Sequence, residues 1–368
     1  MSTPLVPLPA QPPGVPWPGR TWPRADLDAR VDRRELEQLV DGSFHRPADL
    51  GTTRAVLVIQ GGAIVLERYA EGLCARTSHR SWSMAKSWLH AVVGILVGQG
   101  RLDVDAPADV PEWSDPADPR RAITLGQLLQ MRSGLDFVED YLESPKGRRT
   151  VIEMLFGEGR DDVAGYAAGS PLAHESGSTF QYSSGTSNIV ARLASRAAGR
   201  SGEAWHAWLR RELFEPIGAA SAEPRFDAAG TWIASSFLHA TAEDFARLGL
   251  LYLRDGVWGG RQILPGGWVD QAREERSRDD EGRGYGAHFW VETGSLGIFQ
   301  CQGYDGQRTT MVPALDLIVV RLGQTTADLA PNLNLFMECL IDCFRPTAVP
   351  SIAPADGSGT IRGGGTRR

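Results

Sequence analysis

The 368-residue chain lacks the features that mark metal-binding, disulfide-rich and secreted proteins. Its four cysteines include no CxxC pair and have no histidines at metal-ligand spacing, which argues against a zinc site and a disulfide framework. We expect Cys339 and Cys343, four residues apart on a predicted helix, to be buried apolar side chains. The N-terminus has no basic segment followed by an unbroken apolar stretch, as a secretory signal would.

Long apolar runs, clusters of basic residues and two common hydrolase motifs are also missing. The longest apolar stretch, residues 89–97, is too short to span a bilayer. The net charge is −7, whereas binding to nucleic-acid phosphates needs clustered cations. Neither GxSxG nor HExxH occurs, which excludes an α/β-hydrolase nucleophile elbow and a zincin. We expect a cytoplasmic protein that binds a small molecule rather than nucleic acid or a membrane; its oligomeric state stays open.

Lysine is nearly absent. Of the 38 basic residues, only Lys86 and Lys146 are lysine. Arginine stays protonated in proteins, whereas lysine loses its proton near neutral pH when its surroundings disfavour the charge. A lysine retained in this arginine-rich chain is therefore a candidate for proton transfer, although codon usage alone produces the same bias.

Hydrophobic periodicity gives the chain a strand, helix, strand order. Two apolar runs, residues 54–59 and 63–69, are joined by a glycine-containing turn and predict a β-hairpin. A helix-rich middle follows, and short apolar runs beyond about residue 284 predict further strands before a final helix at about 329–344. This order predicts an α/β fold, with an antiparallel sheet built from both chain ends and flanked by helices, and a mostly helical subdomain at about residues 84–235.

Three segments are expected to lie outside this regular pattern. Residues 1–24 are rich in proline and are predicted to form an extended arm before the main domain, residues 25–345. Residues 346–368 contain few apolar side chains and are predicted to be disordered. Residues 138–174 have weak periodicity, which is typical of a long functional loop. A binding site is expected in the crevice between the two lobes.

The central motif is Ser83-Met84-Ala85-Lys86, an SxxK at the start of a predicted helix. A spacing of three places the serine hydroxyl and the lysine amine on one helical face, within reach of each other. The positive end of the helix dipole stabilises a serine alkoxide, and burial disfavours a protonated amine, so Lys86 can act as the base for a nucleophilic Ser83. The alternative is a chance motif, in which Ser83 is an N-cap and Lys86 a solvated amine.

A tyrosine segment supplies a second candidate group. Tyr182 lies in residues 179–185, directly before a predicted helix that starts near Asn188. A tyrosine in such a turn can place its hydroxyl in a cleft and relay a proton to a leaving group. The alternative is a core aromatic whose hydroxyl is satisfied by a hydrogen bond.

A glycine-containing turn supplies a third. Gly303 and Gly306 in the segment 302–307 would let the backbone come close to a ligand. The N–H of Gln307, together with that of Ser83, is then placed to form an oxyanion hole. The competing interpretation is an ordinary β-hairpin, because Asp305-Gly306 is a type I′ turn signal.

These segments and their order resemble the penicillin-recognising serine hydrolases, which include class C β-lactamases, serine D-peptidases, carboxylesterases and nylon-oligomer (aminohexanoate-dimer) hydrolases. Residues 81–87 resemble the nucleophile motif of that superfamily. Residues 128–135 resemble the helix end that follows it, and residues 180–188 the tyrosine motif, with Ser184 where many relatives have asparagine. The resemblance covers about residues 15–345 and is closest to the nylon-oligomer hydrolase and carboxylesterase branch.

The resemblance implies a β-lactamase-like fold and acyl transfer with Ser83 as nucleophile, Lys86 as base and Tyr182 as proton relay, without cofactor or metal. The Lys-Thr-Gly motif of true β-lactamases appears here as Tyr304-Asp305-Gly306. The cation that would hold a substrate carboxylate at this position is therefore missing, which favours a small ester or amide substrate. Two alternatives stay open: a β-lactamase or D-amino-acid peptidase, and an inactive family member that only binds a ligand.

Overall fold

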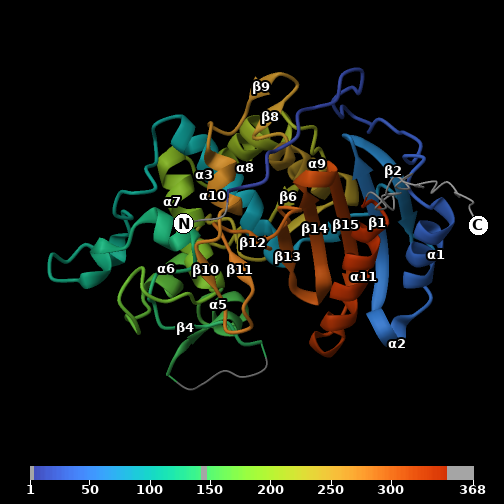
Figure 1. Cartoon of the computed structure of the whole chain (residues 1–368). Coiled ribbons are helices and arrows are strands. Elements are labelled where there is room, and N and C mark those ends of the chain that lie inside the picture. Colours follow the sequence, from blue (N-terminus) through green and yellow to red (C-terminus); the bar gives the residue numbers. More distant parts are fainter. Residues whose placement is uncertain (1–3, 142–146, 346–368) are drawn as a thin grey trace, which may run out of the picture.

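The computed structural model describes residues 4–141 and 147–345, so the segment predicted to be disordered, 346–368, lies outside the described residues. Eight strands form one antiparallel sheet in the order β10-β11-β12-β13-β14-β15-β1-β2 (Figure 1). The bounds of these strands, in chain order, are β1 Thr52–Gln60, β2 Ala63–Tyr69, β10 Ser277–Arg278, β11 Gly284–Tyr285, β12 Trp290–Val291, β13 Phe299–Gly303, β14 Gln307–Val312 and β15 Leu317–Gln324. Because β1 pairs with both β2 and β15, the two ends of the chain meet in one sheet, which confirms the predicted fold class.

Helices cover both faces of the sheet and form most of the second lobe. The α-helices are α1 Arg33–Ser43, α2 Pro47–Leu50, α3 Ala85–Gly98, α4 Leu125–Leu129, α5 Val151–Phe156, α6 Val163–Ala168, α7 Ser184–Ala198, α8 Gly202–Leu209, α9 Ala242–Leu253, α10 Trp268–Arg273 and α11 Ala330–Asp342. The short strand pairings comprise β3 His79–Arg80, β6 Glu223–Pro224 and β7 Leu238–Ala240 in one sheet, β4 Phe137–Val138 with β5 Arg149–Thr150, and β8 Val257–Trp258 with β9 Arg261–Gln262. Across the described ranges, no helix combines the length and the apolar character that crossing a membrane requires.

Two hydrophobic cores lie on opposite faces of the sheet. Side chains alternate along a strand, so Leu57 and Ile59 of β1 enter the larger core with α3 and α9. Val56 and Val58, which point the other way, enter a smaller core with α1 and α11. Because β1 lies inside the sheet and is covered on both faces, its alternating side chains all enter a core. This explains its nearly continuous apolar run.

The segment expected to be a long loop, residues 138–174, contains two short helices, α5 and α6, in its described part. The Thr150 side chain accepts a hydrogen bond from the backbone of Glu153 and starts α5. The Asp162 side chain accepts from the backbone of Gly165 and starts α6 in the same way. Each helix has only six residues, too few for periodicity to distinguish it from a loop, so the expectation of an unstructured segment was wrong here.

The expectation of buried cysteines on the last helix is also wrong. Cys339 is exposed on α11 and Cys343, just after it, is half-buried. The buried face of α11 is formed by Leu333, Phe336, Met337, Leu340 and Ile341. Cys339 and Cys343 are four residues apart and share one side of the helix, at the margin of the core. Cys343 packs against that core, whereas Cys339 is exposed.

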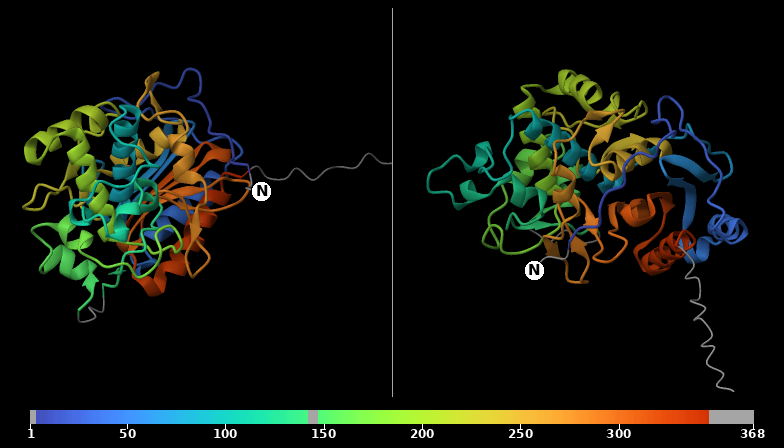
Figure 2. Two further views of the ribbon diagram at one scale, coloured as in Figure 1. Left: turned by 90° about the vertical axis from the view of Figure 1, so that its left-hand side faces the viewer. Right: turned by 45° about the horizontal axis from the view of Figure 1, so that its top comes forward.

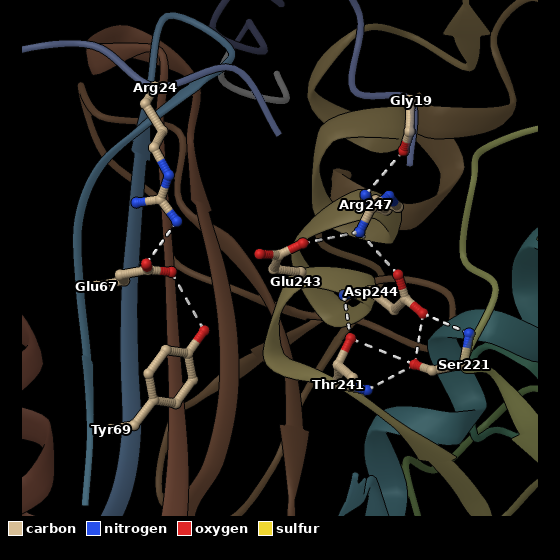
Figure 3. Close-up of polar contacts among 9 residues, drawn as sticks. All are labelled: Gly19, Arg24, Glu67, Tyr69, Ser221, Thr241, Glu243, Asp244 and Arg247. Carbon is tan, nitrogen blue, oxygen red and sulfur yellow. Dashed lines mark hydrogen bonds and ion pairs between the residues drawn. The ribbon is translucent and has the colours of Figure 1, made fainter. Parts of the chain in front are cut away.

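Arginines hold the N-terminal arm, described from residue 4, against the rest of the molecule (Figure 2). The Arg254 guanidinium donates to the Pro9 carbonyl, 3.2 Å away, and Arg247 donates to the Gly19 carbonyl, 3.0 Å away. Figure 3 shows Arg247, with the Arg24 to Glu67 ion pair beside it. The guanidinium suits this task because it presents several donors in a fixed fork to backbone carbonyls.

A single glycine decides how closely α3 packs against α10. A Cβ added at Gly94 would lie 2.4 Å from Nε1 of Trp268, whose ring is fully buried. Overpacking of this kind costs about 1–3 kcal/mol, so we expect Gly94→Ala to lower the free energy of unfolding by about that amount in urea denaturation.

Gly98→Ala on the same helix is the matched control. Its added Cβ would meet only Pro265, at 3.5 Å. Since alanine favours a helix over glycine, the control is expected to leave stability unchanged or raise it by up to about 1 kcal/mol. Equal losses in the two variants would contradict the packing argument.

Candidate functional site

Ser83 lies in a tight turn where the sheet meets the helical lobe. The turn is a 3-10 segment, Trp82–Met84, that leads directly into α3. Trp82 has a φ of 46°, a left-handed conformation that is uncommon for a residue other than glycine and clusters at functional sites. The Ser81 N–H donates to the Leu238 carbonyl of β7 at 2.8 Å, and a Cβ at Gly303 of β13 would lie 2.4 Å from the Ser81 carbonyl oxygen. The turn is therefore fixed from both sides.

Lys86 is almost completely buried beneath this turn. Its Nζ lies 3.0 Å from Oγ of Ser83. It also lies 3.1 Å from Oγ of Ser184 and 2.8 Å from the carbonyl oxygen of Ser235. Ser235 is held in turn by Asn188, whose side-chain oxygen accepts its N–H at 3.1 Å. Two oxygens from distant segments, those of Ser184 and Ser235, thus orient the amine toward Ser83.

The surroundings of Lys86 favour its neutral form. Burial lowers the pKa of Lys86 to about 8, and the nearby Glu139 carboxylate opposes part of this shift. About half of the Lys86 amines are therefore neutral near pH 8, and only a neutral amine has a lone pair that can accept the Ser83 proton. The surrounding residues thus allow Lys86 to act as a base.

Glu139 is a residue of this site that the sequence did not indicate. Its carboxylate accepts hydrogen bonds from the Ser184 N–H at 2.7 Å and from the Ser184 hydroxyl at 2.5 Å. Burial raises the pKa of Glu139, and Lys86 and the Ser184 donors oppose this shift. Ser184 therefore links the carboxylate to the amine. Glu139 follows β4 with no spacing that relates it to the other site residues, so only the fold could identify it.

Tyr182 lies on the other side of the amine. The Lys86 Nζ is 4.8 Å from the centroid of its ring, and the ring stacks on Trp290 with centroids 5.7 Å apart. Burial raises the pKa of Tyr182, and a hydrogen bond with the Ser83 side chain opposes the rise. The phenol therefore keeps its proton at neutral pH and is available as a proton donor beside Ser83.

The turn between β13 and β14 adjoins the serine turn. Asp305 and Gly306 have φ values of 59° and 76°, so both are left-handed, as the type I′ signal predicted. The Gln307 side chain is tied to Gly323, from which its Oε1 accepts and to which its Nε2 donates. Because this side chain is engaged within the fold, the backbone N–H of Gln307 is the group to consider for an oxyanion.

Tyr304 and Tyr141 form the edge of the site. Tyr304 is half exposed and packs edge-on against Trp82, with ring centroids 5.3 Å apart. Tyr141, which the sequence also did not indicate, lies 5.1 Å from Tyr304 by ring centroids. Burial raises the pKa of Tyr141, and hydrogen bonds with the side chains of Ser184 and Ser236 oppose the rise. The structure thus gathers Ser83, Lys86, Tyr182 and Ser184 closely, with the Tyr304 turn beside them.

A cleft of about 430 Å³ opens next to Tyr182. Its lining residues are aromatic, acidic or amide-bearing, with one arginine: Glu139, Phe180, Gln181, Tyr182, Asp279, Asp280, Glu281, Arg283 and Trp290. Within the described ranges, no group of three or more His, Cys, Asp or Glu side chains is placed to hold a metal ion. The site itself offers the hydroxyls of Ser83, Tyr182 and Ser184, the Lys86 amine and the Glu139 carboxylate for chemistry.

The chain is similar to known proteins in sequence and in fold. The sequence profile of the Beta-lactamase family matches residues 51–336. The 6-aminohexanoate-dimer hydrolase of Paenarthrobacter ureafaciens is 28% identical over 318 residues, covering 82% of this chain and 78% of the relative. A family VIII carboxylesterase has a TM-score of 0.65 at 15% identity, covering 87% of this chain and 99% of its own. An octameric penicillin-binding protein homologue from Pyrococcus abyssi has a TM-score of 0.66 at 15% identity, covering 86% and 78%. The two structures share the fold.

The charge of Glu139 should set the pH at which Lys86 becomes neutral. If the reaction at Ser83 needs the neutral amine, its rate rises with pH through about 8. Glu139→Gln removes the negative charge that raises the pKa of Lys86, so the rising limb should move to lower pH. The measurement is the pH dependence of the rate at which a fluorophosphonate labels Ser83.

Glu281→Gln serves as the matched control for this shift. Glu281 lines the same cleft but is not among the charges that act on Lys86. We expect its profile to match that of the unaltered protein. If the labelling rate of Glu139→Gln rises over the same pH range as that of the unaltered protein, or at higher pH, the Glu139 carboxylate does not control the pKa of Lys86.

Proposed function

Because the chain belongs to the β-lactamase family of serine hydrolases, we propose that it cleaves a small ester or amide through an acyl-enzyme on Ser83. The observation that supports this most directly is the position of Lys86. Its buried amine has a pKa lowered to about 8 by burial and lies 3.0 Å from Oγ of Ser83. A buried cation without function would be a costly feature, since desolvation of an amine is unfavourable.

Acylation uses the groups that surround Ser83. Neutral Lys86 accepts the hydroxyl proton while Oγ of Ser83 bonds to the substrate carbonyl carbon. The N–H groups of Ser83 and Gln307 donate hydrogen bonds to the oxyanion that forms. The C–O or C–N bond then breaks, the leaving group takes a proton from Tyr182, and the Lys86 ammonium returns a proton to the phenolate. The amine is neutral again, and the acyl group remains on Ser83.

Deacylation reuses the same groups in the reverse order. A water molecule attacks the acyl carbon, and its proton passes to Lys86 with the help of Tyr182. The ester bond to Ser83 breaks, Oγ recovers the proton, and the carboxylic acid product leaves. The sequence of steps requires neither cofactor nor metal. Four cysteines without a disulfide among them agree with an enzyme of the cytoplasm.

The substrate is proposed to be an ester or amide that lacks a carboxylate beside the scissile bond. The resemblance of the motifs assigns the uncharged Tyr304 to the place where a lysine holds that carboxylate in true β-lactamases. The cleft beside Tyr182 has the aromatic walls Phe180 and Trp290. Faster turnover of a chromogenic cephalosporin than of a short-chain nitrophenyl ester would instead favour the alternative of a β-lactamase or D-amino-acid peptidase.

Covalent labelling tests the nucleophile and the base. A fluorophosphonate should add to the intact mass of the unaltered protein and not to that of Ser83→Ala. Lys86→Arg keeps a positive charge that cannot be lost, so it should slow labelling and ester turnover by about 10²–10⁴-fold. An unlabelled wild-type protein would identify the chain as an inactive binding member, and a fully active Lys86→Arg would exclude the lysine as the base.

Two substrates with different leaving groups test Tyr182. Nitrophenolate leaves without protonation, whereas an amide nitrogen must gain a proton. Tyr182→Phe should therefore lower kcat/KM for a nitroanilide by about 10²-fold or more, and for the matched nitrophenyl ester by less than about tenfold. The control is Tyr285→Phe, because the Tyr285 ring meets the Tyr182 ring edge-on. This substitution should change kcat/KM by the same factor for both substrates. Equal losses in Tyr182→Phe would exclude the relay role.

A further inference from the structure

A second cavity lies outside the cleft beside Tyr182. It is a groove of about 550 Å³ on the sheet face that carries α11. Figure 1 shows α11 against β15 and β1, with β12 and β13 extending to one side of it. The floor of the groove is formed by polar side chains of β13 and β14, and its walls by α11 and by β12 with the segment before it. The groove shares Glu281, Arg283 and Trp290 with the cleft beside Tyr182, so the two cavities adjoin.

Arg308 forms part of this floor and has no anionic partner among the described residues. Its side chain is 8% exposed. The hydrogen bond that its guanidinium makes is from Nη1 to the neighbouring Gln307 carbonyl, 3.1 Å away. Burial of a cation without a counter-charge is unfavourable, so such a group is typically retained for a ligand or for a function.

Of the three other buried arginines of the described chain, two are paired with carboxylates. Arg254 forms an ion pair with Asp316 at 2.6 Å, and Arg247 forms one with Asp244 at 2.8 Å. Both also bind backbone carbonyls of the N-terminal arm. Their charges are compensated within the fold, whereas the charge of Arg308 is not.

A second guanidinium adds to the positive charge at this point. Arg321 of β15 lies directly opposite Arg308 on β14. Its two terminal nitrogens donate to neutral acceptors, including the carbonyl oxygens of Gly306 and Leu50, both 3.2 Å away. Burial lowers the pKa of each arginine to about 10, so both remain charged at neutral pH.

The acidic residues of the groove do not neutralise Arg308. Glu292 is the carboxylate that acts on it, but outside ion-pair distance, and it accepts a hydrogen bond from Gln300 at 2.9 Å. Burial raises the pKa of Glu292, and Glu338 on α11 raises it further. Carboxylates on the walls would repel a polyanion such as a phosphate ester. A ligand with a single negative charge would be repelled less and could pair with Arg308 on the floor.

We propose that this groove binds a small monocarboxylate, with Arg308 as its anchor. A carboxylate matches the guanidinium fork in charge and geometry, and the pair would be largely desolvated. The carboxylate belongs either to the far end of a substrate whose ester or amide bond reaches Ser83, or to a free acid bound beside the cleft. The first source rests on the proposed hydrolase function, and the second does not.

Direct binding tests the anchor without any turnover. Valerate and valeramide differ only in carboxylate against neutral amide, and their affinities are measured by calorimetry on the full chain. Valerate should bind the wild-type protein at least about tenfold more tightly than valeramide, and Arg308→Gln should lose that preference. Arg345→Gln, a groove residue whose guanidinium is already paired with Asp342 at 2.7 Å, should keep it.

Turnover then distinguishes the two sources. The probes are mono(4-nitrophenyl) glutarate, which carries a free carboxylate, and its methyl ester, which does not. If the carboxylate belongs to the substrate, Arg308→Gln should lower the acid-to-methyl-ester ratio of kcat/KM at least about tenfold, through KM. If a free acid binds instead, that ratio should not change, and valerate should still bind through Arg308.

The proposal is overturned if wild-type protein binds valerate and valeramide equally and also shows no preference for the acid ester. This comparison within the wild type holds even if Arg308→Gln fails to fold. Arg308→Lys, which keeps the charge but not the fork, should then give an intermediate preference, and circular dichroism checks its folding. Valerate binding without turnover of any ester would refute the hydrolase proposal and leave the anchor standing.

Discussion

The buried amine of Lys86 is the feature on which the site depends. An amine in the interior is tolerated only where its hydrogen bonds are satisfied, and here oxygens of Ser83, Ser184 and Ser235 surround it. The same burial that makes the amine costly lowers its pKa toward neutrality. Burial of the Lys86 amine therefore costs free energy and, by the same effect, allows the amine to exchange a proton near neutral pH.

This constraint explains how the surrounding elements are arranged. Ser184 is the first residue of α7, and its backbone N–H, free of helical partners at that position, donates to Glu139. The turn that contains Ser83 is held between β7 and β13, with a left-handed conformation at Trp82. The Lys86 amine thus lies next to the start of α7 and the turn before α3, where some backbone groups have no helical partner.

The different roles of lysine and arginine follow from the same effect of burial on a charged side chain. Arg254 and Arg247 hold the N-terminal arm through permanent charge and several donors. Lys86 is buried where its amine can lose its proton near neutral pH. Arg308 fits neither role, because it has no carboxylate partner in the described fold and lines a groove. That contrast is what makes the groove a candidate binding site.

The sequence by itself determined the local features of this protein. The β1–β2 hairpin and the left-handed turn at Asp305 both depend on residues within a few positions of each other. The same holds for the SxxK spacing that brings Lys86 to Ser83. Physically, i to i+3 geometry is fixed by the helix alone and needs no other segment.

Only the tertiary structure decided which distant groups complete the site. Ser184 and Ser235 contact Lys86 across 98 and 149 residues of chain, and Glu139 enters from a segment without recognisable periodicity. The exposed face of Cys339 and the unpaired charge of Arg308 likewise depend on which neighbours pack against them. Burial and charge compensation are properties of the surroundings in space, and no local spacing encodes them.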